Sequence, residues 1–250
     1  MNVLIISQAR LGSTRFPRKV LERVNGKSIL SIHLHRLKKV KLASNIVVAT
    51  TFENGVKKLI DEIKKSNISF FQGSTLDVLD RYYQAAYKFK SNYIVRVTSD
   101  CPLIDPKLID KIINFCLSNN LDYCSNTLEE NFPDGQDIEV FRFKCLLDAW
   151  KKSFQKSDRE HVTPYIKRNS TFFGGKVFKS KPYPIDKNYG NIRMTIDEPE
   201  DLSALNLIIQ ALGIDCDWEE YTSFILKNKK SINNQQIPRS HNYLDISDEK

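Results

Sequence analysis

The chain has 250 residues and a formal net charge of +8 at pH 7, with 41% hydrophobic and 27% charged residues. This composition is typical of a soluble globular protein and excludes an intrinsically disordered chain. No apolar run approaches the roughly 20 residues that a membrane-spanning helix needs, so we expect no membrane partner.

The five cysteines form no pattern that suggests disulfides or a zinc site. Their number is odd, no two have C-x-x-C spacing, and no basic stretch of the signal-peptide kind precedes the first apolar segment. Because free thiols are typical of the reducing cytosol, we expect a cytoplasmic protein.

The positive charge is concentrated at the N-terminus. Residues 1–50 contain ten Lys and Arg against one acid, Glu22, whereas the other 200 residues hold 28 basic and 29 acidic groups. Such a cluster is compatible with a polyphosphate site, with nucleic-acid binding, or with the solvated end of a helix. Binders of single-stranded nucleic acid interleave aromatic and basic residues, but Phe16 is the one aromatic residue in this region. We therefore expect no nucleic-acid partner.

The first 120 residues alternate between predicted strands and helices. Short apolar runs predict strands over 3–7, 45–51, 68–71 and 93–98. Helical periodicity predicts helices over 28–42, 54–65, from a cap at Ser74 or Thr75 to about 90, and from Asp105-Pro106 to about 119. Apolar strands joined through helices imply a parallel sheet with both faces covered. Ligands bind beyond the carboxyl ends of such strands.

The second half of the chain is less regular. Strands are predicted over 137–143, 171–178 and 191–196, and helices over 146–154, 159–167 and 198–213. We divide the chain into a main domain, residues 1–215, and a C-terminal unit, residues 216–250. The C-terminal unit is expected to hold a helix over 217–227 and a loosely attached tail.

The loop after the first strand, residues 8–19, is rich in groups that bind phosphate. It combines glycine, hydroxyl groups and cations, namely Gly12, Ser13, Thr14, Arg10, Arg15, Arg18 and Lys19. These groups, with the backbone amides that glycine exposes, suit a triphosphate; the alternative is an ordinary basic surface loop. The chain has no G-x-G-x-x-G fingerprint, and Gly26-Lys27-Ser28 is not a Walker A motif because Leu21 stands where that motif needs glycine.

Two aspartates follow predicted strands in the same way. Asp100 comes after strand 93–98, Asp197 comes after strand 191–196, and each precedes a proline by two positions. If these strands are parallel neighbours, both carboxylates emerge at one edge of the sheet, where they suit Mg²⁺ bound together with substrate phosphates. The alternative is that each aspartate only forms a turn or caps a helix.

Two further groups could contact a substrate. Asp137 and Glu139 alternate along a predicted strand, so their side chains point to the same face. His161 stands in a dense polar segment, DREHVTPY, over 158–165. A solvated strand face and a structural histidine are the respective alternatives.

Six motifs occur here in the order in which they occur in a known family. They are QARLGSTRFPRKVL, TLDVLDRYYQAA, VRVTSDCPLIDP, PDGQDIEVF, DREHVTPY and RMTIDEPEDL. On these motifs the chain resembles the cytidylyltransferase family of the spore-coat polysaccharide biosynthesis protein F type, over about residues 1–245 with the weaker PRSHNYLDISDE included. It is similar, more distantly, to CMP-sialic acid and CMP-Kdo synthetases.

The resemblance implies an α/β fold, a single GT-A-like Rossmann domain whose mostly parallel, mixed sheet is flanked by helices, with residues 1–215 as the nucleotidyltransferase domain. It implies a Mg²⁺-dependent enzyme that activates a sugar, of the acidic or nonulosonic kind, with CTP for surface polysaccharide biosynthesis. The products would be a CMP-sugar and pyrophosphate, and related synthetases suggest a homodimer. The alternative is a GT-A-type glycosyltransferase with a nucleotide-sugar donor, whose usual D-x-D motif is replaced here by Thr98-Ser99-Asp100.

Carried over by position, the resemblance assigns roles to three groups of residues. The nucleotide would be bound by Arg10, Gly12, Ser13, Arg15, Lys19, Gly73, Ser74 and Asp77. The catalytic residues would be Lys19, Asp100 and Asp197, and the two aspartates would hold the metal. The sugar would face Asp137, Glu139, His161, Tyr165 and Arg193. Phe16-Pro17-Arg18 departs from the Leu-Pro-Gly that is more frequent in the family, which adds a charge to the loop and removes flexibility.

Overall fold

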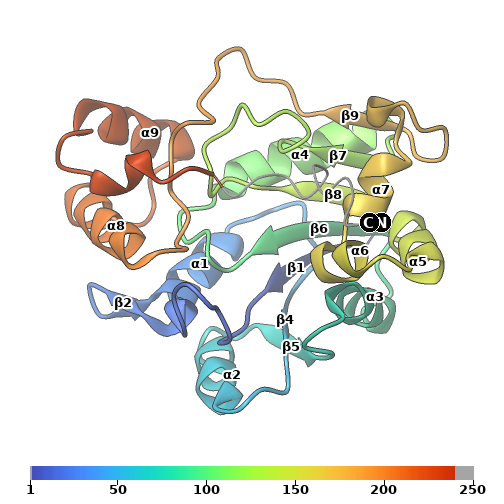
Figure 1. Ribbon diagram of the computed structural model, residues 1–250, viewed down its shortest axis with the longest axis horizontal. Helices are drawn as coiled ribbons and strands as arrows, with labels where there is room; N and C mark the ends of the chain where they lie inside the picture. Colours follow the sequence, from blue (N-terminus) through green and yellow to red (C-terminus); the bar gives the residue numbers. More distant parts are fainter. Residues whose placement is uncertain (1, 240–250) are drawn as a thin grey trace.

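The computed structural model describes residues 2–239, which form a central sheet between two layers of helices (Figure 1). The sheet has seven strands in the order β5-β4-β1-β6-β8-β7-β9. They are β1 (Val3–Gln8), β4 (Asn45–Thr50), β5 (Ser69–Gln72), β6 (Tyr93–Thr98), β7 (Tyr123–Ser125), β8 (Glu139–Arg142) and β9 (Ser180–Pro182). β1, β4, β5 and β6 run parallel, β8 is antiparallel to β6 and β7, and β9 is parallel to β7. The predicted α/β fold with a mostly parallel, mixed sheet is confirmed.

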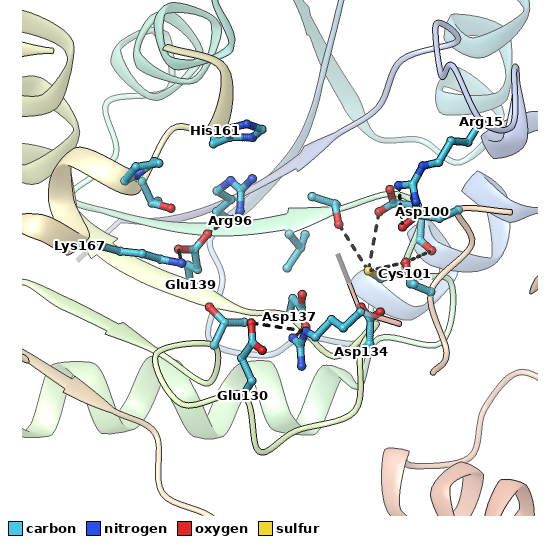
Figure 2. Close-up of a pocket in the computed structure, with 18 residues that line it drawn as sticks. Arg15, Arg96, Asp100, Cys101, Glu130, Asp134, Asp137, Glu139, His161 and Lys167 are labelled. Carbon is cyan, nitrogen blue, oxygen red and sulfur yellow. Dashed lines mark hydrogen bonds and ion pairs between the residues drawn. The ribbon is translucent and has the colours of Figure 1, made fainter. Parts of the chain in front are cut away.

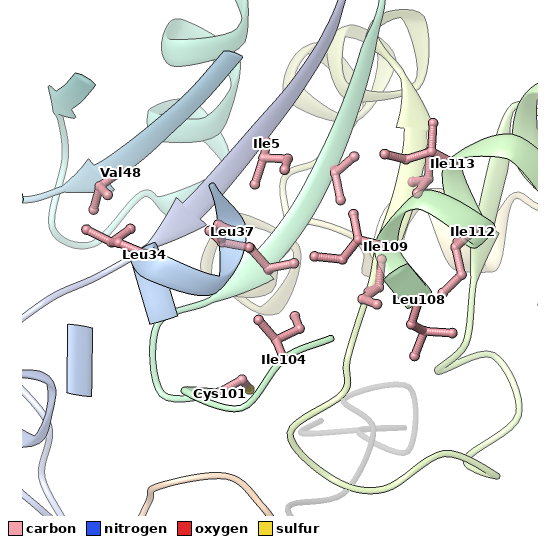
Figure 3. Close-up of a cluster of buried hydrophobic side chains, with 14 of the residues drawn as sticks. Ile5, Leu34, Leu37, Val48, Cys101, Ile104, Leu108, Ile109, Ile112 and Ile113 are labelled. Carbon is pink, nitrogen blue, oxygen red and sulfur yellow. The ribbon is translucent and has the colours of Figure 1, made fainter. Parts of the chain in front are cut away.

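Helices cover both faces of this sheet. On one face, α1 (Ile29–Leu37), α2 (Val56–Lys65) and α4 (Pro106–Ser118) share a core with β1, β4 and β6, part of which Figure 3 shows. The other face is covered by α3 (Val78–Lys88), α5 (Phe143–Lys152) and α7 (Pro164–Arg168). Successive side chains of a strand point to opposite faces of the sheet, so one strand contributes to both cores: Ile5 of β1 lies in the first core and Ile6 in the second. Strands buried on both faces must be apolar throughout, which is why they were recognisable in the sequence.

The C-terminal helices form a third apolar cluster beside the sheet. α8 (Pro199–Leu212) and α9 (Trp218–Lys227) pack together with α1, and α6 (Lys156–His161) lies against α3. A two-stranded hairpin of β2 (Arg23–Val24) and β3 (Lys27–Ser28) precedes α1. The sequence analysis did not predict this hairpin or β7, because segments of two or three residues show no periodicity.

Capping signals fix several helix ends as predicted. The Asp105 carboxylate accepts two backbone hydrogen bonds at the start of α4, with Pro106 in the first turn. Asp217 caps α9, and α8 ends at Gly213. The cap of α3 is Asp77, however, and not Ser74 or Thr75.

Three predicted elements of the second half are wrong. Residues 191–196 form no strand: one bridge joins Asp134 to Arg193, and the alternating apolar side chains pack into the cluster of α8 and α9 instead of a sheet. Residues 171–178 hold a 3₁₀ turn (Thr171–Phe173) ended by Gly174 at a positive φ of 81°. The predicted helix over 159–167 is split at Val162, because Pro164 cannot continue the preceding hydrogen-bond ladder.

Two helix boundaries also differ from the prediction. The helix expected over 28–42 ends at Leu37, and the helix expected from 146 begins at Phe143. Helix termini leave unpaired backbone groups that other parts of the chain can satisfy, so their limits depend on contacts that periodicity does not report.

The described part of the C-terminal tail is firmly bound, which corrects the expectation of a loose attachment. Asn234 Nδ2 donates to Asp201 Oδ1 at 2.9 Å, and the side chain of Gln235 makes two hydrogen bonds, each of 2.9 Å, to the backbone of Arg193. Arg239 reaches Asp137. Residues 240–250, with most of the PRSHNYLDISDE motif, lie outside the described residues.

Candidate active site

A cleft with a cavity volume of about 220 Å³ opens beyond the carboxyl end of β6 (Figure 2). It is lined by residues from the loop after β1, β6, the loop that follows β6, segment 127–139, helices α6 and α7 with Thr163 between them, segment 195–197 and the C-terminal tail. The lining residues are Arg15, Arg96, Val97, Thr98, Asp100, Cys101, Thr127, Glu130, Asp134, Asp137, Glu139, His161, Thr163, Pro164, Lys167, Thr195, Asp197 and Arg239.

Lys19 joins the two aspartates at one end of this cleft. Its Nζ lies 2.8 Å from Asp100 Oδ2 and 2.6 Å from Asp197 Oδ1. Burial, the largest influence, lowers the pKa of Lys19, but the two carboxylates outweigh it and hold the pKa above its usual value. Burial likewise raises the pKa of Asp100, but the attraction of Lys19 brings it down to about 2. Both carboxylates therefore contact a single cation.

Arg15 extends the same charged cluster toward solvent. Its guanidinium lies 3.4 Å from Asp197 Oδ2 and 3.1 Å from Glu198 Oε1, and its side chain is half exposed. Arg15 and Asp100 lie together on one side of the cleft in Figure 2, away from His161 and Glu139.

Backbone hydrogen bonds, not sheet pairing, bring Asp100 and Asp197 together. The Ile196 N–H donates to the Asp100 carbonyl at 2.8 Å. The Asp201 carboxylate accepts from the N–H groups of Asp197 and Glu198, both at 2.8 Å, at the capping box that begins α8. The two aspartates thus lie side by side, although the neighbouring strands that led us to expect this arrangement do not exist.

The loop after β1 directs two amides at an anion. The N–H groups of Leu11 and Gly12 donate to the two carboxylate oxygens of Glu53 at 2.7 and 2.8 Å, and Thr51 Oγ1 donates to the same carboxylate at 2.7 Å. Successive amides aimed at one anion form a concavity of the kind that binds phosphate. An internal carboxylate therefore occupies an anion site in the loop assigned to the nucleotide.

The rest of this loop leads into the short 3₁₀ turn that begins with Lys19. Arg18 has a left-handed backbone, φ 60°, and begins the 3₁₀ turn Lys19–Leu21. This is the position at which the family more often has glycine, which adopts such a φ without cost. Ser13 Oγ accepts from the Phe16 N–H at 3.3 Å, and Arg10 is exposed.

The residues expected near the nucleoside lie outside the cavity lining. Asp77 caps α3 and pairs with Arg159 of α6. Ser74 Oγ accepts from the Asp77 N–H at 2.9 Å, and the Gly73 N–H donates to the Thr50 carbonyl at 3.0 Å. These residues form a separate loop beyond β5.

Glu139 and its cations form the opposite side of the cleft. Arg96 Nη1 and Tyr123 Oη donate to the buried Glu139 carboxylate, and Lys167 Nζ lies 3.8 Å away. Burial raises the pKa of Glu139, but Arg96 and Lys167 outweigh it and lower the pKa to about 2. His161 also lines this side, and burial lowers its pKa to about 4. Figure 2 shows His161, Arg96 and Glu139 in succession.

The third wall combines acids with an arginine from the tail. Arg239 Nη2 lies 2.7 Å from Asp137 Oδ1, and its Nη1 donates to the Phe132 carbonyl. Burial, followed by the charge of Asp137, raises the pKa of the neighbouring Asp134 to about 7.

Two residues assigned to the sugar are placed elsewhere. The Arg193 guanidinium is 3% exposed and pairs with Asp201 at 2.7 Å and with Asp134 at 3.2 Å. Tyr165 packs beside Phe178 at the second core. Neither side chain belongs to the cavity lining, whereas Asp137, Glu139 and His161 do.

Sequence reasoning missed five charged residues of the lining, namely Arg96, Glu130, Asp134, Lys167 and Arg239. Arg96 had a visible signal, since it interrupts an apolar strand, VRV, whose other residues are buried. Arg239 had none, because its segment shows no periodicity.

The described residues hold no group of three or more His, Cys, Asp or Glu that could bind a metal by themselves. Within residues 2–239 no helix is long and apolar enough to cross a membrane, and all five cysteines are free.

Comparisons with known proteins agree on one family. A family model described as "Cytidylyltransferase" matches residues 4–232. The chain is 31% identical to the spore coat polysaccharide biosynthesis protein SpsF of Bacillus subtilis over 85% of this chain and 88% of that protein. It is 27% identical to an 8-amino-3,8-dideoxy-manno-octulosonate cytidylyltransferase of Shewanella, over 83% and 80%. A solved cytidylyltransferase structure from Leptospira borgpetersenii is 36% identical, with a TM-score of 0.88 over 96% of this chain and 100% of that one.

Proposed function

The chain belongs to the cytidylyltransferase family, and from that premise we propose that it transfers CMP from CTP to a hydroxyl of a sugar acid. The reaction would require Mg²⁺, release pyrophosphate and supply a CMP-sugar for surface polysaccharide. The family transfers nucleotidyl groups, so the glycosyltransferase alternative is set aside.

The observation that carries this proposal is the contact of Lys19 with both Asp100 and Asp197. The cleft beside them is lined by six carboxylates and four Lys or Arg side chains. A cleft with an excess of acids does not bind a triphosphate by its own charge. Triphosphate binding therefore needs additional cations. We propose that they bind at the Lys19 cluster, which we define as Arg15, Lys19, Asp100 and Asp197.

The donor set fits a magnesium ion. Mg²⁺ prefers oxygen ligands and is usually bound through one or two carboxylates plus substrate phosphates. Asp100 and Asp197 already reach one cation, Lys19 Nζ, so we assign the metal to them, with Lys19 turned to the phosphates. When bound, the ion would neutralise charge on the triphosphate.

The chain's own residues would position the reactants. Arg10, Arg15 and Lys19 would bind the triphosphate together with the amides that now hold Glu53. The sugar oxygen forms a bond to the α-phosphorus as the bond to pyrophosphate breaks, and the hydroxyl proton passes to solvent. Orientation and charge neutralisation are the main sources of rate acceleration in such transfers.

The opposite side of the cleft supports the choice of a sugar acid. The Shewanella relative acts, by its name, on an octulosonate, which is a sugar acid. Arg96 and Lys167 line the cleft around Glu139, and we propose that they attract the substrate carboxylate. His161, whose pKa of about 4 leaves it neutral at pH 7, would bind a sugar hydroxyl.

The proposal is tested by pyrophosphate release from purified protein with CTP, Mg²⁺ and a panel of sugar acids and neutral sugars. We expect release with CTP and a sugar acid, and its loss when Mg²⁺ is chelated. Release with UTP but not with CTP, or consumption of a nucleotide-sugar without pyrophosphate, would contradict the proposal.

A further inference from the structure

Arg81 of α3 is a fully buried arginine with unpaired donors. Its Nη1 donates to the Ser74 carbonyl at 2.6 Å, whereas Nε and Nη2 have no hydrogen-bond partner among residues 2–239. Arginine keeps its charge inside proteins and offers only donors. Leaving two of these donors buried and unpaired is unfavourable for folding, which indicates that they serve a ligand.

The position of Arg81 lies between the two loops assigned to the nucleotide. Arg81 interacts electrostatically with Arg10, which belongs to the loop after β1, and with Glu53, the carboxylate that the amides of this loop hold. Its side chain runs under the loop beyond β5, where a Cβ on Gly73 would lie only 2.9 Å from Arg81 Cγ. The absence of a side chain at Gly73 therefore makes room for the aliphatic stem of Arg81.

Gln8 supplies a second unpaired group on the same face of the sheet. Leu4 and Ile6 of β1 belong to the core under α3, so strand alternation places Gln8 on that face, at the carboxyl end of β1. Gln8 Oε1 is buried and has no partner in the described part of the chain. One acceptor and two donors thus remain unused at this edge.

We propose that Arg81 recognises the pyrimidine base of the bound nucleotide, with Nε and Nη2 donating to O2 and N3 of cytosine. The two donors form a side-on fork that matches two adjacent acceptors. Gln8 Oε1 would accept from the 4-amino group of the same base. Uracil carries an N–H at position 3, and a guanidinium has no acceptor to receive it. Arg81 would thereby select CTP over UTP.

This inference rests on the proposed function, because it assumes that a nucleotide binds between the two loops. Arg81 is fully buried and its Nη1 is held by the Ser74 carbonyl, so we infer that the loop over 73–77 would move aside as the base enters. Leu76 in this loop is 86% exposed, so that displacement would uncover little apolar core.

The first test uses the unaltered protein and titration calorimetry with Mg²⁺ and four ligands: CTP, UTP, 3-deaza-CTP and inorganic tripolyphosphate. 3-Deaza-CTP keeps the shape of cytosine but lacks the N3 acceptor. We expect UTP and 3-deaza-CTP to bind about tenfold to hundredfold more weakly than CTP. Equal affinity for CTP and 3-deaza-CTP would overturn the inference. If neither CTP nor tripolyphosphate binds, the proposed function itself fails.

The second test uses Arg81→Met, with Arg142→Met as a control. Arg142 packs over Tyr93 at the amino end of β6, so its loss removes one charge far from the cleft. Arg81→Met should bind CTP and 3-deaza-CTP equally weakly, because Gln8 contacts the 4-amino group that both ligands carry, and it should keep its tripolyphosphate affinity. Arg142→Met should behave like the unaltered protein. Retained discrimination between CTP and 3-deaza-CTP in Arg81→Met would overturn the inference while leaving the proposed function intact. Should that variant not fold, the 3-deaza-CTP comparison decides alone.

Discussion

Two clusters of charge meet at Asp197, and their environments differ. In the Lys19 cluster, the side chains of Lys19, Asp100 and Asp197 are 11%, 27% and 18% exposed. In the Arg193 cluster, which we define as Arg193, Asp134, Asp201 and Asn234, the Arg193 and Asp201 side chains are 3% and 0% exposed. The first cluster can exchange partners with a ligand, whereas Arg193 and Asp201 are sealed within the protein and Asp134 is the member of their cluster that lines the cleft.

The comparison shows that neighbouring charges in one motif can serve different purposes. Arg193, Asp197 and Asp201 all belong to RMTIDEPEDL. The Asp201 carboxylate accepts a hydrogen bond from the backbone N–H of Asp197, and the Arg193 guanidinium neutralises that carboxylate. Only Asp197 presents its carboxylate to the cleft, so the other two support its position.

The largest expected effect is on catalysis by the Lys19 cluster. Asp100→Asn and Asp197→Asn should each lower turnover by at least about a hundredfold, since removal of one group that stabilises transition-state charge typically costs that much. Circular dichroism and the melting temperature should change little, because both side chains are partly exposed. Turnover near that of the unaltered protein in either variant would remove the aspartate from the metal site.

The Arg193 cluster should give the opposite result. Arg193→Met leaves the Asp201 charge buried with fewer partners, and breaking a buried ion pair costs about 3–5 kcal/mol of folding stability. Denaturant unfolding should show this loss, while the folded fraction keeps its affinity for the sugar. A normal stability with a selective rise in the KM for the sugar would instead return Arg193 to the sugar-binding role that the resemblance assigned.

A smaller effect should separate phosphate binding from overall positive charge. Arg10→Ala and Lys19→Ala should weaken CTP binding by about tenfold to hundredfold, because charge-assisted contacts to phosphate contribute roughly 1.5–3 kcal/mol. Lys41→Ala is the matched control, because Lys41 is an exposed cation of residues 1–50 that lies outside the loop over 8–19. Equal CTP affinity in all three variants, measured by calorimetry, would refute the phosphate role of the loop.

The smallest effect concerns pH. The pKa of Asp134 is raised from 3.8 to about 7, mainly by burial and then by Asp137. A carboxyl whose pKa is higher in the folded state binds its proton more tightly there, so its contribution to stability is complete below about pH 4 and is lost as pH rises through 7. The melting temperature of the unaltered protein should therefore fall more steeply between pH 5 and 8 than that of Asp134→Asn. Parallel curves would show that Asp134 does not titrate in this range.

The sequence predicted the parts of the fold whose signals are local. β1, β4 and β6 are mainly apolar runs, and Asp105-Pro106 is a helix-start signal that predicts the beginning of α4. Residues 191–196 show the same alternation as a strand but pack against helices, and periodicity does not identify the packing partner. For the site, the loop motif indicated Lys19 and the spacing before proline indicated the aspartates.

The rest of the site depends on contacts between distant parts of the chain. Arg239 reaches the cleft because Asn234 and Gln235 bind Asp201 and the Arg193 backbone, and no local pattern encodes those bonds. Arg81 stands within a helical pattern in which an arginine is usually solvated. Its burial became evident only with the loop beyond β5 in place.

The Glu53 carboxylate in the loop after β1 has a consequence for which anions the loop accepts. Glu53 is tethered, so it competes for the Leu11 and Gly12 amides at a high effective concentration that no dilution reduces. A small anion such as inorganic phosphate gains only those two amides and must displace the carboxylate to reach them. Under the proposed function, a triphosphate would also engage Arg10, Arg15 and Lys19 and could complete the exchange. The loop would thereby favour a long polyanion over inorganic phosphate.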